Sequence, residues 1–355
     1  MSRFWSDAVK NLTPYLPGEQ PQIDKLIKLN TNENPYGPSP KVLEAIAHAT
    51  NDDLRKYPDP NTSDLKRAIA QHYNLSDKEV FIGNSSDEVL AHTFRALLKQ
   101  DKPLLFPDIT YSFYPVYCQL FDIEYQQVPL DDNFCINIDD YSPHNGGIIF
   151  ANPNAPTGIA LSLDKVKQLA KQHSDSVIVI DEAYVDFAKD SAVRLIAECP
   201  NLVVTQTLSK SRSLAGLRVG IALGQAELIE DLERVKNSFH PYALDKLAIA
   251  GATAAFEDKT YLAGTCAKVI ATRERITKEL ITLGFEVLPS SANFVFAKHK
   301  SRDAEGLFQG LRDKKILVRY FNAPRIDDFL RISIGTDKEM DCLLTELSKL
   351  TGDQQ

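Results

Sequence analysis

The sequence predicts an α/β fold, a three-layer sandwich around a mostly parallel central sheet, with a smaller α/β lobe at the C-terminal end. Helical patterns alternate with short β-branched runs such as "GGIIFANP", "SVIVIDEAY" and "NLVVTQTLSK", which begin apolar and end polar. Runs that are apolar on both faces suit a buried parallel sheet, because helices cover both of its faces. At 355 residues the chain also exceeds what one hydrophobic core usually organises.

The pattern along the chain divides it into three segments. Residues 1–30 contain Pro14, Pro17, Gly18 and Pro21 and predict an N-terminal arm rather than an independent unit. Residues 31–240 hold the alternating elements of a large domain, including the amphipathic "DLKRAIAQHY". In residues 241–355 the helical patterns lengthen ("DKLAIAGATAAFED", "AKVIATRERITKELITLG") and precede the strand-like pieces "ANFVFAKH", "ILVRYF" and "FLRISIG". They predict a small C-terminal domain.

Charge and cysteine usage narrow the class of protein. The formal net charge is −8, with acidic and basic residues interspersed, which argues against binding to nucleic acid or to an anionic membrane. The sequence has no secretory pattern at its start and no apolar stretch of about 20 residues that could span a bilayer. The five cysteines have no CxxC spacing and the seven histidines do not cluster. We therefore expect a cytoplasmic protein with reduced thiols and no metal site.

Polar side chains follow the buried runs, where a parallel sheet gathers its ligands. Small polar residues after Gly83 open a helix whose free N–H groups form an anion site. Asp181 directly follows four β-branched residues, and a carboxylate there needs a cation or a strong donor, although a helix cap is an equally open interpretation. The loop "NPNAPTG" after a third run reads as a simple turn when taken alone.

These strand ends supply the groups that pyridoxal phosphate requires. Its aldehyde forms a Schiff base with a lysine amine, and its ring stores electrons while the ring nitrogen stays protonated. Lys210 provides the amine and Asp181 the carboxylate that pairs with the ring nitrogen. The remaining residues form an anion cradle for the cofactor phosphate: Ser86, Asp87, Thr207, Ser209 and Arg218.

A family resemblance covers nearly the whole chain. The sequence resembles the fold-type I aminotransferases of the class II group, and among them the histidinol-phosphate aminotransferase family. Each matching motif is weak alone, but their order is specific. The motifs are "LNTNENPYGPSP" (29–40), "YPDP" (57–60), "GNSSDE" (83–88), "PDITYSFY" (107–114), "NPNAPTG" (152–158), "DEAYVDF" (181–187), "TLSKSRSLAGLRVG" (207–220) and "LRISIG" (330–335).

The resemblance implies further cofactor contacts. Tyr111 is similar to the aromatic residue that stacks on the cofactor ring, and Asn154 and Tyr184 resemble the pair that hydrogen-bonds its phenolic oxygen. Tyr57 is similar to the tyrosine that reaches the cofactor phosphate of the neighbouring subunit, which implies a homodimer whose N-terminal arm packs with the small domain and the partner. Family members commonly have glycine where this chain has Ser85, so a positive φ there would strain the backbone.

The resemblance also implies the reaction. Lys210, Asp181 and Tyr184 would be catalytic, with Lys210 as general acid and base for transfer of the amino group of L-histidinol phosphate to 2-oxoglutarate, giving imidazole-acetol phosphate and L-glutamate in histidine biosynthesis. Substrate anions would be held by Tyr15, Asn154, Arg319 and Arg331. Arg331 is an unusual charge in "LRISIG", where a salt bridge at a strand edge is the other interpretation.

Three other activities remain open. A decarboxylase of the phosphothreonine type shares this cofactor frame and breaks a different bond. An aromatic or broad-range aminotransferase would prefer unphosphorylated donors. A regulator that binds the cofactor without catalysis would need a DNA-binding module, and this chain has no room for one before the large domain.

Overall fold

The large domain is built on a seven-stranded sheet in the computed structural model, which describes residues 3–10, 12–15 and 18–352. The strand order is β2-β8-β7-β6-β5-β3-β4. Only β8 runs against its neighbours β2 and β7, and the other pairs are parallel. The strands are β2 (Val80–Asn84), β3 (Leu104–Pro107), β4 (Tyr125–Val128), β5 (Gly147–Ala151), β6 (Ile178–Asp181), β7 (Leu202–Thr207) and β8 (Val219–Gly224).

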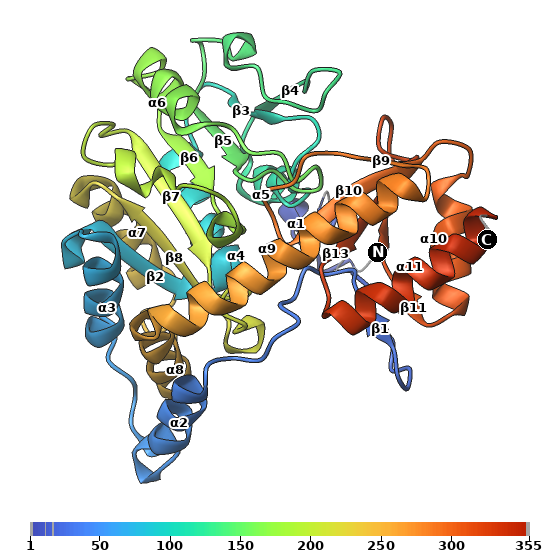
Figure 1. The fold of residues 1–355 in the computed structure, drawn as a ribbon. Coiled ribbons are helices and arrows are strands. Elements are labelled where there is room, and N and C mark those ends of the chain that lie inside the picture. Colours follow the sequence, from blue (N-terminus) through green and yellow to red (C-terminus); the bar gives the residue numbers. More distant parts are fainter. Residues whose placement is uncertain (1–2, 11, 16–17, 353–355) are drawn as a thin grey trace.

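Helices cover both faces of this sheet (Figure 1). The helices of the large domain are α2 (Pro40–Ala49), which packs against α8, and α3 (Ser63–Tyr73), α4 (Ser85–Thr93), α5 (Tyr114–Phe121), α6 (Leu163–Gln172), α7 (Ala226–Phe239) and α8 (Lys246–Glu257). Within the described residues, the large domain also has six short 3₁₀ segments and one π-helical segment. They are η1 (Asp52–Arg55), η2 (Asp77–Glu79), η3 (Phe94–Leu98, π), η4 (Ile138–Asp140), η5 (Val185–Phe187), η6 (Ala192–Leu195) and η7 (Ala215–Leu217).

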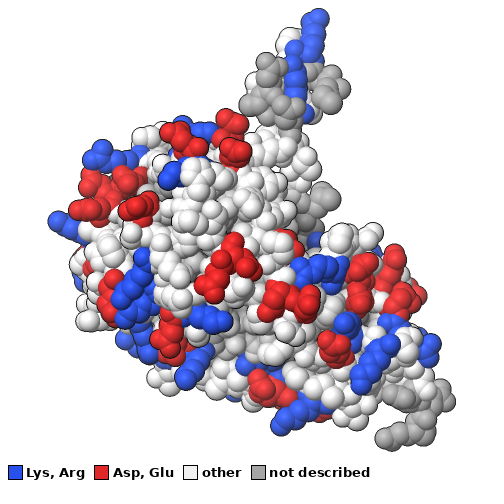
Figure 2. All heavy atoms as spheres, turned by 90° about the horizontal axis from the view of Figure 1, so that it is seen from above, with Lys and Arg blue, Asp and Glu red and all other residues white. Residues whose placement is uncertain are grey.

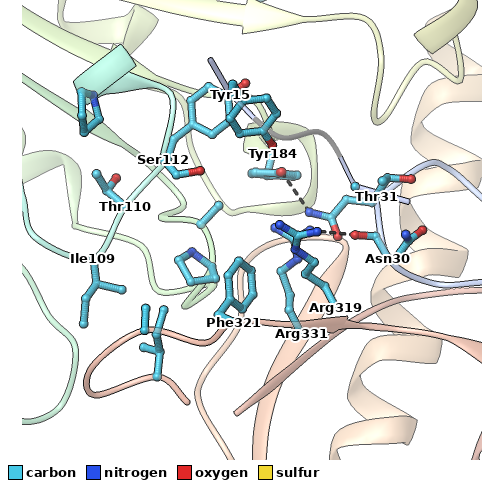
Figure 3. Close-up of a pocket in the computed structure, with 18 of the residues that line it drawn as sticks. Tyr15, Asn30, Thr31, Ile109, Thr110, Ser112, Tyr184, Arg319, Phe321 and Arg331 are labelled. Atoms are coloured by element: carbon cyan, nitrogen blue, oxygen red, sulfur yellow. Dashed lines mark hydrogen bonds between the residues drawn. The ribbon is translucent and has the colours of Figure 1, made fainter. Parts of the chain in front are cut away.

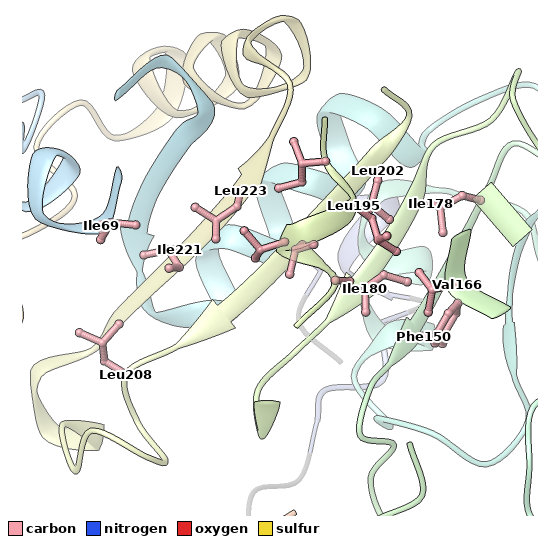
Figure 4. Packing of buried hydrophobic residues seen from close by; sticks show 14 of the residues in the cluster. Ile69, Phe150, Val166, Ile178, Ile180, Leu195, Leu202, Leu208, Ile221 and Leu223 are labelled. Carbon is pink, nitrogen blue, oxygen red and sulfur yellow. The ribbon is translucent and has the colours of Figure 1, made fainter. Parts of the chain in front are cut away.

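Alternate residues of each central strand enter different hydrophobic cores. In β6, Ile178 and Ile180 pack with α3 and α6, whereas Val179 packs on the other face with α4, α5 and α7. Figure 4 shows the first of these cores, which includes Phe150, Ile180 and Val166. Because successive strand residues point to opposite faces, a strand buried on both sides must be apolar throughout. The predicted three-layer α/β fold is confirmed.

The C-terminal lobe has its own four-stranded antiparallel sheet, ordered β12-β13-β10-β9. Its buried side chains form a separate core with α9, α10 and α11. The predicted "ILVRYF" strand is divided, because its first half pairs with the N-terminal arm and its second half with β13. The elements are α9 (Lys259–Thr282), β9 (Phe285–Val287), β10 (Phe294–His299), α10 (Ala304–Asp313), β11 (Ile316–Leu317), β12 (Arg319–Tyr320), β13 (Leu330–Ser333) and α11 (Asp337–Thr351).

The N-terminal arm contacts both the large domain, through Tyr15 and Phe113, and the lobe, through a short strand. It contains α1 (Asp7–Lys10) and β1 (Ile27–Lys28), and β1 pairs in parallel with β11. Pro17, which helped to predict the arm, lies outside the described residues. Helix α8 packs against α2 and α3, and α9 then runs on into the lobe (Figure 1). The domain division after residues 30 and 240 stays a prediction.

Charged residues of both signs are interspersed over the face shown in Figure 2, without a block of one sign. Within the part of the chain that the structure describes, no helix is long and apolar enough to cross a membrane.

Candidate active site

A cavity of about 760 Å³ lies where the large domain, the arm and the lobe meet (Figure 3). Seven of the residues predicted from the sequence line it: Tyr15, Tyr111, Tyr184, Lys210, Arg218, Arg319 and Arg331. The other predicted residues lie outside the lining set: Tyr57, Ser86, Asp87, Asn154, Asp181, Thr207 and Ser209. Lys210 and Tyr184, which follow the ends of β7 and β6, thus line the cavity together with residues of the arm and the lobe.

Lys210 follows the end of β7, and its Nζ donates a hydrogen bond of 2.9 Å to the backbone oxygen of Thr31 in the arm. Burial, together with the nearby charge of Arg331, lowers the pKa of Lys210 to about 8. A lysine in a dry site loses its proton more easily because desolvation penalises the ammonium form. A neutral amine is the form that attacks a carbonyl, so Lys210 is suited to condense with an aldehyde near neutral pH.

Asp181 is the last residue of β6 and is 4% exposed. Its carboxylate accepts hydrogen bonds from the Tyr114 hydroxyl at 3.0 Å and from the Thr205 hydroxyl at 3.4 Å. Burial raises the pKa of Asp181 to about 6 despite these donors. A buried carboxylate of this kind is stabilised by a cation, and a protonated pyridine nitrogen would supply one.

The N-terminus of α4 lies against β8 at very close range. A Cβ built on Gly220 would come within 2.3 Å of the Ser86 nitrogen, so only glycine fits there. Ser85 adopts a φ of 72°, the conformation that favours glycine. Its backbone therefore carries the strain that was expected from a serine at this position. Its hydroxyl oxygen accepts a hydrogen bond of 3.2 Å from the Asp87 nitrogen, which offsets part of that strain. The free N–H groups of this helix end suit a phosphate.

Arg218 and the hydroxyls after β7 lie around the same helix end. Arg218 Nη2 lies 2.7 Å from Asp87 Oδ2, and the Tyr111 hydroxyl donates to the other carboxylate oxygen at 3.3 Å. The Thr207 hydroxyl donates to the Ser209 hydroxyl oxygen at 2.9 Å. Thr207 is also the Cα partner of Gly220, which brings these hydroxyls to the strand that contacts α4. The residues predicted to hold the phosphate thus lie close together, and their role in binding it stays a prediction.

Two of the residues expected at the cofactor ring, Tyr184 and Asn154, already have hydrogen-bond partners within the protein. The Tyr15 ring lies 6.4 Å from that of Tyr111, and the Tyr184 hydroxyl accepts a hydrogen bond of 3.0 Å from Asn32. Asn154 Nδ2 already donates to the Ile109 backbone oxygen and to the Thr157 hydroxyl, at 2.9 and 3.1 Å. A phenolic oxygen could bind Asn154 only by taking the place of one of these acceptors.

Arg319 and Arg331 are direct partners on β12 and β13. Like charges opposite each other destabilise a sheet unless an anion lies between them. Arg331 Nη2 donates to the Asn30 backbone oxygen at 2.8 Å, while its buried Nε has no hydrogen-bond partner. Within residues 3–10, 12–15 and 18–352 neither arginine has an ion pair, so the salt-bridge interpretation of Arg331 finds no support there. Figure 3 shows both guanidinium groups in the cavity, where they suit an anionic substrate.

Sequence reasoning missed two polar residues of the site. Tyr114 binds Asp181, and Asn32 connects Tyr184 to Ser333 of the lobe, whose hydroxyl donates to Asn32 Oδ1 at 2.8 Å. Asn32 has a φ of 57°, which asparagine tolerates better than most residues. Both residues lie in motifs that carried the family resemblance, and their place in these motifs is the feature of the sequence that could have indicated them.

Tyr57 lies away from the cavity of its own chain. Its side chain is 80% exposed, and its ring stacks on Tyr242 with centroids 4.7 Å apart. The predicted contact of Tyr57 with the cofactor phosphate of a neighbouring subunit therefore stays a prediction.

Known proteins resemble this chain over almost its whole length. The family described as aminotransferase class I and II matches residues 24–347. Histidinol-phosphate aminotransferase 1 of Pseudomonas fluorescens is 60% identical over 350 residues, covering 99% of this chain and 100% of that protein. Histidinol-phosphate aminotransferase 2 of Dechloromonas aromatica is 59% identical over 356 residues, covering 99% and 100%.

A solved structure agrees with these relatives. The histidinol-phosphate aminotransferase of Sinorhizobium meliloti, in complex with pyridoxal-5'-phosphate, superposes with a TM-score of 0.88 at 25% identity and covers 99% of both chains. Identity near 60% over full-length relatives leaves the family in no doubt. This chain belongs to the histidinol-phosphate aminotransferases, within aminotransferase class I and II.

Proposed function

We propose that the protein uses pyridoxal phosphate to transfer the amino group of L-histidinol phosphate to 2-oxoglutarate, forming imidazole-acetol phosphate and L-glutamate in histidine biosynthesis. Family membership supports the reaction class. The single observation that carries the choice of substrate is the pair Arg319 and Arg331, neither of which has an ion pair among the described residues. When bound, the cofactor supplies an aldehyde that exchanges amines and a ring that stores the electrons of the substrate carbanion.

The residues present fit this cofactor. The N–H groups at the start of α4, the guanidinium of Arg218 and the hydroxyls of Thr207 and Ser209 would hold its phosphate. Tyr111 would stack on the ring and Asp181 would pair with its nitrogen, whereas Tyr184 and Asn154 would contact its phenolic oxygen. The carboxylate of Asp181 supports this arrangement, because it is buried without a cationic partner among the described residues.

Lys210 would move the proton. With a pKa lowered to about 8, its amine can accept a proton from the substrate α-carbon near neutral pH and return it as the ammonium form. The Thr31 carbonyl, which accepts from Nζ in the structure, orients the amine along the cavity. Asp181 would keep the ring nitrogen protonated during this step.

The arginine pair would hold the substrate anion. Histidinol phosphate carries a phosphate where an amino acid carries its α-carboxylate, and a planar guanidinium binds either group with two parallel hydrogen bonds. A second cation beside the first favours the doubly charged phosphate. Tyr15, whose ring lies 4.8 Å from Phe113, lines the same end of the cavity. Glutamate could use the same site in the second half of the reaction.

We infer that the active unit is a homodimer in the cytoplasm. Tyr57 and Tyr242 stack on each other as an exposed aromatic pair, and Phe239 and Leu54 are also exposed. Large exposed apolar groups of this kind are typical of protein interfaces. A second copy of the chain would cover them and bring Tyr57 to the cofactor phosphate.

A panel of amino donors with 2-oxoglutarate as acceptor tests the function. We expect glutamate formation with a kcat/KM for histidinol phosphate at least about 10²-fold above that for histidinol, which offers the arginines no anion, and above that for phenylalanine, whose α-carboxylate carries only one charge. Comparable kcat/KM values for phenylalanine would favour the broad-range aminotransferase. Release of carbon dioxide from phosphothreonine without glutamate formation would favour the decarboxylase.

A further inference from the structure

Tyr114 contacts two groups that the cofactor would touch. Its hydroxyl donates to Asp181 Oδ2 at 3.0 Å, and its ring meets the ring of Tyr111 edge-on, with centroids 5.6 Å apart. Asp181 is expected at the ring nitrogen and Tyr111 at the ring face. One side chain therefore contacts both of these residues from behind, although it does not line the cavity itself.

The position of this hydroxyl is set by packing. Tyr114 is fully buried at the first residue of α5, which Pro115 helps to begin. Its ring lies between Phe94 and Phe106, with centroids 6.1 and 5.9 Å away. A tyrosine held on several sides in this way has one place for its oxygen, and that place is the carboxylate of Asp181.

Tyr114 acts as a donor over the whole working pH range. Burial and the neighbouring charge of Asp181 raise the pKa of Tyr114 well above its usual value, so the phenol keeps its proton. A donor of this kind stabilises the charged form of the carboxyl group it binds. Thr205 donates to the other oxygen of Asp181 at the longer distance of 3.4 Å, and so contributes less.

The proton shared by Asp181 and a pyridine nitrogen has two possible positions. It lies on the nitrogen while the carboxyl group is charged, or on the carboxyl group while the nitrogen is neutral. Burial without other partners favours the neutral arrangement, whereas each donor to the carboxylate favours the charged one. A ring stores electrons well only in the charged arrangement.

We propose that Tyr114 is a positioning residue, whose hydroxyl holds Asp181 as an oriented carboxylate and thereby keeps the proton on the cofactor's ring nitrogen. This role rests on the proposed cofactor site and extends it beyond the residues that line the cavity. The hydroxyl acts through Asp181 and touches neither cofactor nor substrate.

The test uses Tyr114→Phe, which removes only the hydroxyl, with Tyr141→Phe as the control, a buried tyrosine outside the cavity lining. Each protein is loaded with pyridoxal phosphate labelled with ¹⁵N in the ring, and the nitrogen shift is followed with pH. We expect the nitrogen of Tyr114→Phe to lose its proton about one pH unit or more below the wild-type midpoint. Thr205→Val should give a smaller change in the same direction, and Tyr141→Phe none.

A second measurement separates this role from the cofactor assignment. In the cofactor-free protein, ¹³C NMR of the Asp181 carboxyl should show its midpoint raised by about one pH unit in Tyr114→Phe and unchanged in Tyr141→Phe. An unchanged midpoint, or a ¹⁵N profile equal to that of the wild type, would overturn the role of Tyr114. A wild-type protein that takes up no pyridoxal phosphate would instead overturn the cofactor assignment, whatever the Asp181 midpoint does.

Discussion

The contact between Gly220 and the start of α4 makes a sharp prediction about cofactor binding. Replacing Gly220 with Ala would place a Cβ 2.3 Å from the Ser86 nitrogen and 2.4 Å from the Ser85 carbonyl carbon. Contacts under 3.0 Å essentially never occur, and both neighbours are backbone atoms that cannot rotate away. The end of α4 must therefore shift away from β8, and its N–H groups shift with it.

The size of the effect follows from this overlap. Overpacking a close-packed site lowers the free energy of unfolding by about 1–3 kcal/mol. A Gly→Ala change also raises it by about 0.4–1 kcal/mol, because alanine has less conformational freedom in the unfolded chain. We therefore expect the free energy of unfolding to fall by about 2 kcal/mol. Loss of one charge-assisted hydrogen bond to the phosphate is worth about 1.5–3 kcal/mol, or about a 10- to 100-fold rise in the Kd for pyridoxal phosphate.

Gly224 provides the matched control. It lies on the same strand and, four residues on, on the same face as Gly220, but its Cβ would meet no atom closer than 3.2 Å. Urea unfolding and titration of each cofactor-free variant with pyridoxal phosphate measure the two effects. We expect Gly224→Ala to bind the cofactor like the wild type. Equal Kd values for Gly220→Ala and Gly224→Ala would refute an anion site at the start of α4.

The paired arginines, the exposed Tyr57 and the buried Lys210 amine each make a further prediction. Steady-state kinetics should show that Arg319→Ala lowers kcat/KM more for histidinol phosphate than for glutamate, by about tenfold or more, whereas Arg331→Ala lowers kcat/KM for both. Equal losses for the two substrates in Arg319→Ala would mean that the second cation does not favour the doubly charged phosphate. Mixed dimers of Tyr57→Phe and Lys210→Ala chains should regain part of the activity, because one of their two sites is intact, and no gain after verified subunit exchange would place Tyr57 in its own chain's site. For Lys210, the folded pKa of about 8 lies below the unfolded value of about 10.4, so the unfolded chain binds more protons between these values. The burial of the ammonium group therefore destabilises the folded protein fully below pH 8, and this penalty is lost as the pH rises. The free energy of unfolding of the cofactor-free wild-type protein should increase from pH 8 to 10.5 by more than that of Lys210→Met. Parallel pH profiles of the two proteins would mean that the amine is not desolvated.

The central strands could be predicted because each is buried on both faces and therefore reads as a short apolar run. The direction of β8 could not, since a run that is apolar throughout carries no sign of whether its neighbours are parallel or antiparallel. The division of "ILVRYF" was hidden for a different reason. Its first half pairs with Ile27 and Lys28, almost 290 residues earlier, and a pairing across that separation leaves no local pattern.

The residues of the site that could be predicted from the sequence are the reactive side chains that directly follow a buried strand. Lys210 and Asp181 both come at the ends of buried runs, and the structure places Lys210 in the lining of the cavity and Asp181 in the buried layer beside Tyr114 and Thr205. Tyr114 reads as an ordinary core aromatic, because its hydroxyl meets Asp181 only through packing between residues 67 apart. The crowded hydrogen bonding of Asn154 is equally invisible in the sequence, since it depends on where the Ile109 backbone lies.

The central claim is that Lys210 is the amine that bonds the cofactor. Lys28 is a second lysine at the same place, since its Nζ donates to the hydroxyl of Thr31 while Lys210 donates to the carbonyl of the same residue. Reduction of the cofactor-loaded protein with borohydride, followed by peptide mass mapping, distinguishes the two. We predict one pyridoxyl group per chain, on the peptide that contains Lys210. A pyridoxyl group on Lys28, or on no lysine at all, would contradict the account.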